Sequence, residues 1–107
     1  MSPHRGPAAV TMVVRFSVDP DRQDDLIAAL DATGAVMRRR PGFLGSACYA
    51  GTDGAHVVNI SHWASQADLE AARADPAGTV LAQRMFDIAT PDPVHCVLRS
   101  TLEPPAA

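Results

Sequence analysis

The feature that most constrains this chain is the stretch from Val57 to Trp63, which mixes apolar and polar side chains in a β-strand pattern. Its β-branched residues, and the only Trp of the chain, favour a strand. Side chains on a strand alternate between two faces, so Asn59 and Ser61 share one face with Trp63, and Ile60 lies on the other. A buried Asn is costly unless it is hydrogen-bonded. This strand therefore carries either a satisfied structural amide or a binding surface.

The chain has 107 residues, which is enough for one domain and too few for two. Apolar residues make up 47% of it and charged residues 20%, as is typical of a globular protein. The net charge is −3, and the only basic run is at 38–40, so we expect no nucleic-acid partner. The first seven residues hold no apolar run, and no stretch approaches the roughly 20 apolar residues of a membrane span. We therefore expect a cytoplasmic protein without a membrane partner.

Pro, Gly and Asp divide the chain into alternating strands and helices. Asp19-Pro20 can cap and open a helix that Pro41-Gly42 stops, with the arginines at 38–40 at its solvated end. Ser65, with Asp68 three residues on, begins a second helix that Asp75-Pro76 ends. The predicted elements are strands at 10–18, 43–51, 55–63 and 94–102, helices at 20–40, 65–74 and 79–88, and a loop at 90–93.

The order β-α-β-β-α-(α)-β is that of the ferredoxin-like split βαβ, an α+β fold with a four-stranded antiparallel sheet and helices on one face. We expect residues 1–9 to form a flexible tail, 10–102 the domain and 103–107 a C-terminal tail. Aliphatic side chains occur on both faces of the central strands, so one apolar face is left uncovered. That face predicts a homodimer, sheet against sheet, in the form of a dimeric α/β barrel.

The residue pattern does not indicate a metal site or a cofactor site. Cys48 and Cys96 lie in different segments without metal-ligand spacing, and we expect both to be buried free thiols. His56 and His62 are about 20 Å apart if they lie on one strand, which is too far to share an ion. No Gly-rich phosphate loop and no nucleophile elbow is present. We predict no metal site, no cofactor, and no histidine as general base.

Several short motifs resemble the antibiotic biosynthesis monooxygenase family. They are Pro41-Gly42-Phe43-Leu44, Thr52-Asp53-Gly54, Val57-Val58-Asn59, Trp63-Ala64-Ser65 and Ala74-Asp75-Pro76, within residues 10–101. The pairing of Asn59 with Trp63 resembles the branch of the family that oxidises aromatic polyketides. The resemblance implies a cofactor-independent monooxygenase that oxidises an aromatic polyketide, anthrone or hydroquinone-type substrate to a quinone with O2.

The resemblance also implies roles for residues in a pocket between the sheet and the helices. Asn59 would stabilise the anion that develops on the substrate oxygen, and Trp63 would pack on the rings and donate its N–H. Family positions for a His, a Tyr and an Arg align with or near Tyr49, Leu69 and Arg84, which would contact the substrate. The alternative function is a polyketide cyclase, or a non-catalytic dimeric module that binds a small ligand.

The turn between the second and third strands decides which face Tyr49 occupies. With a two-residue turn at Asp53-Gly54, Tyr49 pairs with Val58 on the face of the dimer. With a three-residue turn, Tyr49 pairs with Val57 on the face of Asn59, because a shift of one residue moves every side chain across the sheet. The family position of Tyr49 lies in the pocket, so we predict the second register.

Overall fold

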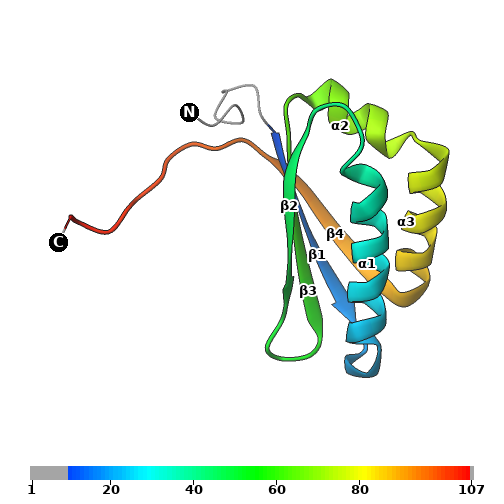
Figure 1. The fold of residues 1–107 in the computed structure, drawn as a ribbon. Coiled ribbons are helices and arrows are strands. Elements are labelled where there is room, and N and C mark those ends of the chain that lie inside the picture. The colour runs from blue at the N-terminus through cyan, green and yellow to red at the C-terminus, as the bar shows by residue number, and fades with distance from the viewer. Residues whose placement is uncertain (1–9, 107) are drawn as a thin grey trace.

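The computed structural model of this chain describes residues 10–106, and the tail predicted at 1–9 lies outside them. The elements are β1 (Val10–Val18), a 3₁₀ turn η2 (Pro20–Arg22), α1 (Gln23–Met37), β2 (Phe43–Ala50), β3 (His56–Trp63), α2 (Gln66–Arg73), α3 (Pro76–Ile88) and β4 (Ala89–Cys96). The sheet order is β2-β3-β1-β4, and each neighbouring pair is antiparallel. The helices cover one face of the sheet (Figure 1). The predicted ferredoxin-like fold is confirmed, as a single open sheet.

The start of the first helical segment follows the predicted cap. The Asp19 carboxylate accepts a hydrogen bond of 2.9 Å from the backbone N–H of Asp21, and Pro20 occupies the first helical position. The first turn is a 3₁₀ turn, and α1 ends at Met37, three residues earlier than predicted. Arg40 is not a solvated helix end: its guanidinium lies 3.3 Å from the Asp75 carboxylate. This half-buried ion pair joins the end of α1 to the junction of α2 and α3.

The junction of α2 and α3 departs from the prediction at one point. Ser65 caps α2 as expected, by accepting a 3.1 Å hydrogen bond from the N–H of Asp68. Asp75-Pro76 ends α2 but also begins α3, since the Asp75 carboxylate accepts a 2.9 Å hydrogen bond from the N–H of Ala77. A proline at the first helical position loses no helical hydrogen bond, so α3 begins three residues earlier than predicted.

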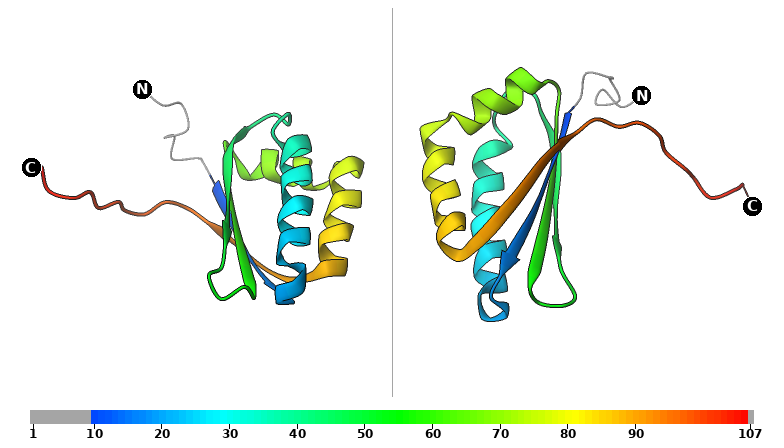
Figure 2. Two further views of the ribbon diagram at one scale, coloured as in Figure 1. Left: turned by 60° about the horizontal axis from the view of Figure 1, so that its bottom comes forward. Right: turned by 180° about the vertical axis from the view of Figure 1, so that it is seen from behind.

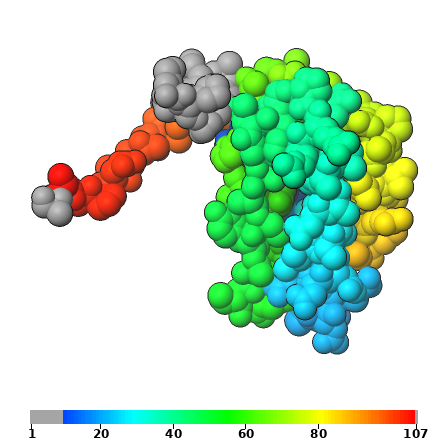
Figure 3. All heavy atoms as spheres, viewed as in Figure 1, coloured from blue at the N-terminus to red at the C-terminus, as the bar shows by residue number. Residues whose placement is uncertain are grey.

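The predicted loop at 90–93 is wrong, because β4 runs straight through it. Pro91 lies opposite Phe16, and Pro93 lies opposite Val14 on β1. A strand at the edge of a sheet tolerates proline, since the missing N–H can face the free edge rather than the ladder. The strand ends at Cys96, and residues 97–106 have no regular secondary structure. They stand away from the body of the molecule (Figures 1 and 3).

The register of the central hairpin contradicts the prediction for Tyr49. Tyr49 pairs with Val58, so it lies on the face opposite Asn59, where 57% of its surface is exposed. The loop is longer than a two-residue turn, but it pairs the two strands in the register that the two-residue turn would give. Each side chain therefore lies on the face expected for that turn. The N–H of Gly51 donates to the His56 carbonyl at 2.7 Å, and residues 51–54 form a turn. Gly54 has a φ of 77°, which the turn requires and which glycine adopts without strain.

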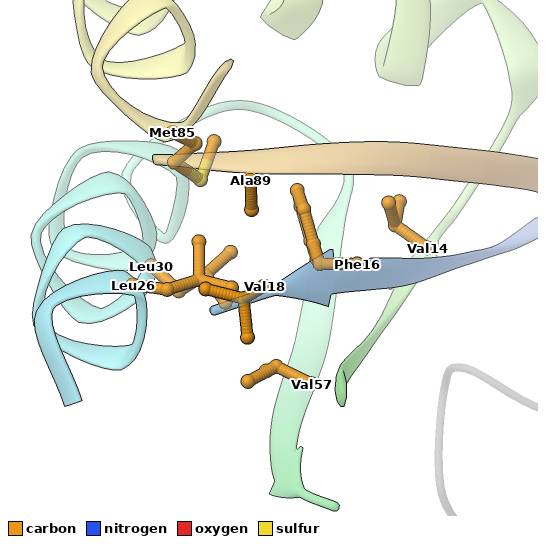
Figure 4. Packing of buried hydrophobic residues seen from close by; sticks show 8 residues of the cluster. All are labelled: Val14, Phe16, Val18, Leu26, Leu30, Val57, Met85 and Ala89. Carbon is orange, nitrogen blue, oxygen red and sulfur yellow. The ribbon is translucent and has the colours of Figure 1, made fainter. Parts of the chain in front are cut away.

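Two apolar clusters occupy the two ends of the space between the sheet and the helices. The larger cluster joins β1, β3 and α1 to the end of α3 and the start of β4 (Figure 4). Its buried members are Val14, Phe16, Val18, Leu26, Leu30, Val57, Met85 and Ala89. The smaller cluster consists of Val10, Trp63, Leu69 and Ala72. Met12 packs against both clusters and lies where they meet.

The other face of the sheet carries no helix in the described part of the chain, as predicted (Figure 2). Val13 on β1 lies between Ile60 on β3 and Val94 on β4. Tyr49 and Val58 extend this apolar surface onto the central hairpin. Within residues 10–106, no helix is long and apolar enough to cross a membrane.

Two glycines provide a test of this packing. Gly42 has a φ of 82°, and a Cβ there would meet the side chain of Asp68. We expect Gly42→Ala to lower the free energy of unfolding by about 1–3 kcal/mol, because an L-residue is strained in that conformation. Gly34 lies inside α1 with nothing within 4 Å of an added Cβ. Gly34→Ala should therefore raise stability by about 0.5–1 kcal/mol. Urea unfolding of both variants measures the difference, and equal effects would contradict the assigned φ of Gly42.

Candidate functional site

A partly enclosed cavity of about 380 Å³ lies between the helical face of the sheet and the three helices. Its polar lining side chains are Thr33, Ser46, Asn59, Ser61, Arg73, Thr79 and Gln83. Its apolar walls include Met12, Phe16, Leu30, Met37, Phe43 and Met85. The cavity therefore has a polar floor on β2 and β3 and apolar sides, which suits a flat aromatic ligand that carries oxygen substituents.

A second hollow of about 540 Å³ lies where the end of β1 meets the hairpin loop and the end of α3, beside His56 and Phe86. It is more open to solvent than the partly enclosed cavity. Neither Asn59 nor Trp63 lines it. The partly enclosed cavity is therefore the better candidate for a site that shields a ligand from water.

Asn59 is half-buried on β3, and its side chain lines the cavity. Cys48 lies directly opposite Asn59 on β2, so the neighbour of the amide on that face of the sheet is a thiol. Within residues 10–106, none of the side-chain hydrogen bonds involves the Asn59 amide. The described chain therefore gives the Asn59 amide no backbone partner of the kind that a structural amide would have. The two N–H donors of the amide are available to a ligand.

Trp63 closes one end of the cavity and belongs to the core at the same time. Its indole is 2% exposed and meets the Phe43 ring edge to face, with ring centroids 5.3 Å apart. Leu69 and Ala72 from α2 belong to the same buried cluster. The indole N–H donates a hydrogen bond of 3.1 Å to the Ser61 hydroxyl. Trp63 thus offers its ring to the cavity, while its N–H is already bonded.

Of the other predicted contact residues, the structure brings only Leu69 to the cavity. Leu69 is 2% exposed and forms part of the wall beside Trp63. Tyr49 lies on the opposite face of the sheet, so its predicted place in the pocket is wrong. Arg84 is exposed on α3, whose residues 82, 83, 85 and 86 line the cavity while 84 does not. The rotation of α3 directs Arg84 away from the site.

Arg73, which was not among the residues predicted to contact the substrate, is the charged residue that lines the cavity. It lies in the last turn of α2, four residues after Leu69 and one after Ala72. Residues three and four apart share one face of a helix, so this spacing could have placed it beside Leu69. Among the described residues its guanidinium has no ion-pair partner. Arg73 can therefore attract an anionic group on a ligand.

No carboxylate or imidazole from the described chain lines the cavity. His56 lies in the hairpin, 2.7 Å from the Asp53 carboxylate. The backbone N–H of Ala55 and the His56 ring hold the pKa of that carboxyl below its usual value. His62 contacts Thr11 at 2.8 Å on the uncovered sheet face. These positions give neither histidine access to a ligand in the cavity.

His95 lies outside the cavity as well, on β4, where its ring contacts Gln66 at 3.3 Å. In the described part of the chain, no group of three or more His, Cys, Asp or Glu side chains is placed to hold a metal ion. The polar groups that face the cavity are hydroxyls, amides and one guanidinium. A ligand there meets hydrogen-bond donors and a positive charge, but no group that ordinarily takes up a proton at neutral pH.

The two cysteines are free, as predicted, but they are half-buried rather than buried. They lie on opposite faces of the sheet, since Cys48 pairs with Asn59 and Cys96 pairs with Thr11. Burial, with a further contribution from the negative charge of Asp31, raises the pKa of the Cys48 thiol. Burial therefore disfavours the thiolate of Cys48, which is the nucleophilic form.

Comparison with known proteins shows the family of this chain. The family model for antibiotic biosynthesis monooxygenases matches residues 9–80. The chain belongs to the antibiotic biosynthesis monooxygenase family. It is 35% identical over 95 residues to tetracenomycin-F1 monooxygenase of Streptomyces glaucescens. The match covers 84% of this chain and 81% of that protein.

Two solved structures of monooxygenases share this fold. One is the monooxygenase from the gene ActVA-Orf6 of Streptomyces coelicolor in complex with nanaomycin D. It is 29% identical, has a TM-score of 0.82, and the match covers 96% of this chain and 99% of that one. The other is SnoaB, a cofactor-independent oxygenase from Streptomyces nogalater. It is 28% identical, has a TM-score of 0.78, and the match covers 89% of this chain and 97% of that one.

The contrast between the two arginines yields a prediction for this family member. Arg73→Ala should weaken binding of an anionic aromatic such as 1-hydroxy-2-naphthoate by roughly two- to fivefold, since a solvent-exposed ion pair contributes about 0.2–1 kcal/mol. Arg84→Ala removes the same charge outside the cavity and should leave affinity unchanged. Quenching of the fluorescence of Trp63, the only Trp of the chain, measures binding. A larger loss for Arg84→Ala would show that α3 is wrongly oriented.

Proposed function

We propose that this protein is a cofactor-independent monooxygenase that oxidises an aromatic polyketide, anthrone or hydroquinone-type substrate to a quinone with O2. The observation that carries the proposal is the Asn59 amide, which lines the cavity without a hydrogen-bond partner in the described chain. Two relatives named as monooxygenases, and one named as a cofactor-independent oxygenase, support the same reaction class.

The cavity suits the anion of such a substrate. The apolar walls would accept fused rings, and the Asn59 amide and the Ser61 hydroxyl on the β3 floor would donate to an oxygen substituent. Hydrogen bonds to a developing anion are strong in a site that excludes water. Because no carboxylate or imidazole of the described chain lines the cavity, we infer that the substrate's acidic hydroxyl or enol proton passes to water. The site then favours the anion by binding it.

The anion is the reductant in this reaction. It transfers electrons to O2, and the resulting carbon–oxygen bond gives a peroxide on the ring. Cleavage of the O–O bond leaves one oxygen atom as the quinone carbonyl and releases the other as water. For an anthrone the sum is anthrone plus O2 giving anthraquinone plus water, so that no external reductant is needed. The protein's part is to hold the substrate, stabilise its anion and keep the reacting carbon accessible to O2.

Of the two alternative functions, the lining residues disfavour the polyketide cyclase. A polyketide cyclase needs a group that moves protons during ring closure. The described lining residues carry hydroxyls, amides and one guanidinium, none of which ordinarily takes up a proton at neutral pH. A non-catalytic binding module would use the same apolar walls, and it is distinguished from an oxygenase only by turnover.

We further propose that the protein is a homodimer. The uncovered sheet face carries Val13, Ile60 and Val94 in adjacent positions on three strands. The segment 97–106 stands away from the body of the molecule, and Leu98 in it is 78% exposed. A second copy that packed sheet against sheet would cover both surfaces and would form the dimeric α/β barrel.

Asn59 tests the oxygenase. Asn59→Ala should lower the rate of oxygen uptake with an anthrone by on the order of 10²–10³, because a donor to the developing anion is lost. Asn59→Asp keeps the shape but places a negative charge there, and should be at least as slow. Both rates are measured after subtraction of uncatalysed oxidation, beside thermal melts. If Asn59→Ala instead loses about 1–3 kcal/mol of stability while its folded fraction turns over normally, the amide is structural.

Ile60 tests the dimer. Ile60→Asp should shift the protein to monomers at micromolar concentration, because the face opposite Asn59 would bury an unpaired charge. Ala28→Asp, on the exposed side of α1, is the matched control and should leave assembly unchanged. Light scattering coupled to size-exclusion chromatography gives the mass of each species. A wild-type monomer would contradict the proposed interface.

A further inference from the structure

The N–H of Trp63 is not free to reach a ligand. It donates to the Ser61 hydroxyl at 3.1 Å, and both residues lie on the same face of β3. The indole is 2% exposed and is held edge to face against Phe43. For the N–H to contact a substrate directly, this hydrogen bond would have to break and a buried ring would have to turn. Such a rearrangement is opposed by close packing around the ring.

The Ser61 hydroxyl, in contrast, has a proton to give. A hydroxyl is one donor and accepts through two lone pairs, and here one lone pair accepts the indole N–H. Within residues 10–106 the hydroxyl donates to no acceptor, although it lines the cavity. Ser46 lies directly opposite on β2 and lines the cavity too, but no hydrogen bond joins the two serines in the described chain. The Ser61 proton is therefore available to whatever occupies the cavity.

Asn59 and Ser61 are two residues apart on one strand, so their Cα atoms are separated by roughly 6.6 Å and their side chains share a face. One ligand oxygen can lie between an amide N–H and a hydroxyl at that spacing. A hydroxyl that itself accepts a hydrogen bond becomes a better donor, since hydrogen bonds in a chain polarise one another. The Trp63 N–H donates to the Ser61 hydroxyl, and the Ser61 O–H would in turn donate to the substrate oxygen.

We propose that Ser61 and Asn59 together bind the oxyanion of the substrate, and that Trp63 acts on it through Ser61 rather than directly. Ser61 is thus a further specificity-determining residue, which selects a ligand with an acidic ring hydroxyl. Trp63 is a positioning residue that holds and polarises the Ser61 hydroxyl. The proposal rests on the proposed function for the identity of the ligand, and it deepens that function by naming the second donor.

The test uses 4-nitro-1-naphthol, a coloured phenol whose ring is too electron-poor to be oxidised readily. Its visible absorbance distinguishes the bound phenolate from the bound phenol across a pH titration. Ser61→Ala should weaken phenolate binding roughly tenfold or more, because a hydrogen bond to a charged group is lost, and should change phenol binding less than about twofold. Ser61→Thr keeps the hydroxyl and should restore wild-type affinity. Ser17→Ala is the matched control, because Ser17 is exposed on β1 and does not line this cavity, and it should stay within about twofold of the wild type.

A double-mutant cycle separates a relay from two independent contacts. If Trp63 acts through Ser61, the single variant Trp63→Phe should bind the phenolate more weakly than the wild type. The double variant should bind it no more weakly than Ser61→Ala alone. Additive losses would overturn the relay. The single indole N–H signal in ¹⁵N NMR gives a readout without ligand. Ser61→Ala should shift that signal, whereas Ser17→Ala should not. An unmoved signal in Ser61→Ala, or an equal loss of phenolate affinity in Ser61→Ala and Ser17→Ala, would overturn the proposal.

The same variants distinguish this proposal from the proposed function. If the wild type takes up no oxygen with anthrones or naphthols but Ser61→Ala still loses phenolate affinity, the oxygenase assignment fails and the oxyanion site stands. If oxygen uptake is normal in Ser61→Ala and phenolate affinity is unchanged, the oxygenase assignment stands and Ser61 is no donor.

Discussion

The cavity depends on the packing of Trp63 at the end of β3. Its ring meets Phe43 across the irregular pairing at the start of β2, and Leu69 packs into the same buried cluster. This fills one end of the space beneath the helices. The larger cluster around Phe16 and Leu30 fills the other end. Small residues lie between them on the helices, among them Gly34, Gly78 and Ala82. Met12 lies between the two clusters on the sheet, but these small helical residues leave the layer unfilled, and a cavity remains.

The polarity of that cavity follows from the same strand. The apolar walls lower the local dielectric, so that hydrogen bonds to a charged ligand gain in strength. Asn59 and Ser61 supply donors from the floor, and Arg73 supplies a positive charge from the end of α2. The described lining contributes no carboxylate, so a bound anion meets no like charge. Such a site favours an anionic aromatic, and this is the property that a direct reaction with O2 needs.

Local chemistry accounts for the parts of the fold that could be predicted from the sequence. Asp19 and Ser65 cap the first two helical segments through hydrogen bonds to their own neighbours, and such contacts need no distant partner. Pro76 was ambiguous, since proline both ends one helix and suits the first turn of the next. The prolines of β4 indicated a loop, because local rules alone do not show that a strand lies at an edge of the sheet. In each case the missing information was the position of the segment relative to others.

The sequence by itself determined that Asn59, Ser61 and Trp63 share one face of a strand, because alternation with a period of two is a property of the local backbone. Only the tertiary structure decided which side chains meet that face. Tyr49 lies away from it because the loop closed by Gly51 and His56 sets the register, and both registers satisfy the same local preferences. The rotation of α3 directs Arg84 away from the cavity, and the end of α2 brings Arg73 to it. Both follow from helix orientation, which is set by burial against the sheet. The bond from Trp63 to Ser61 likewise depends on a ring orientation that packing against Phe43 imposes.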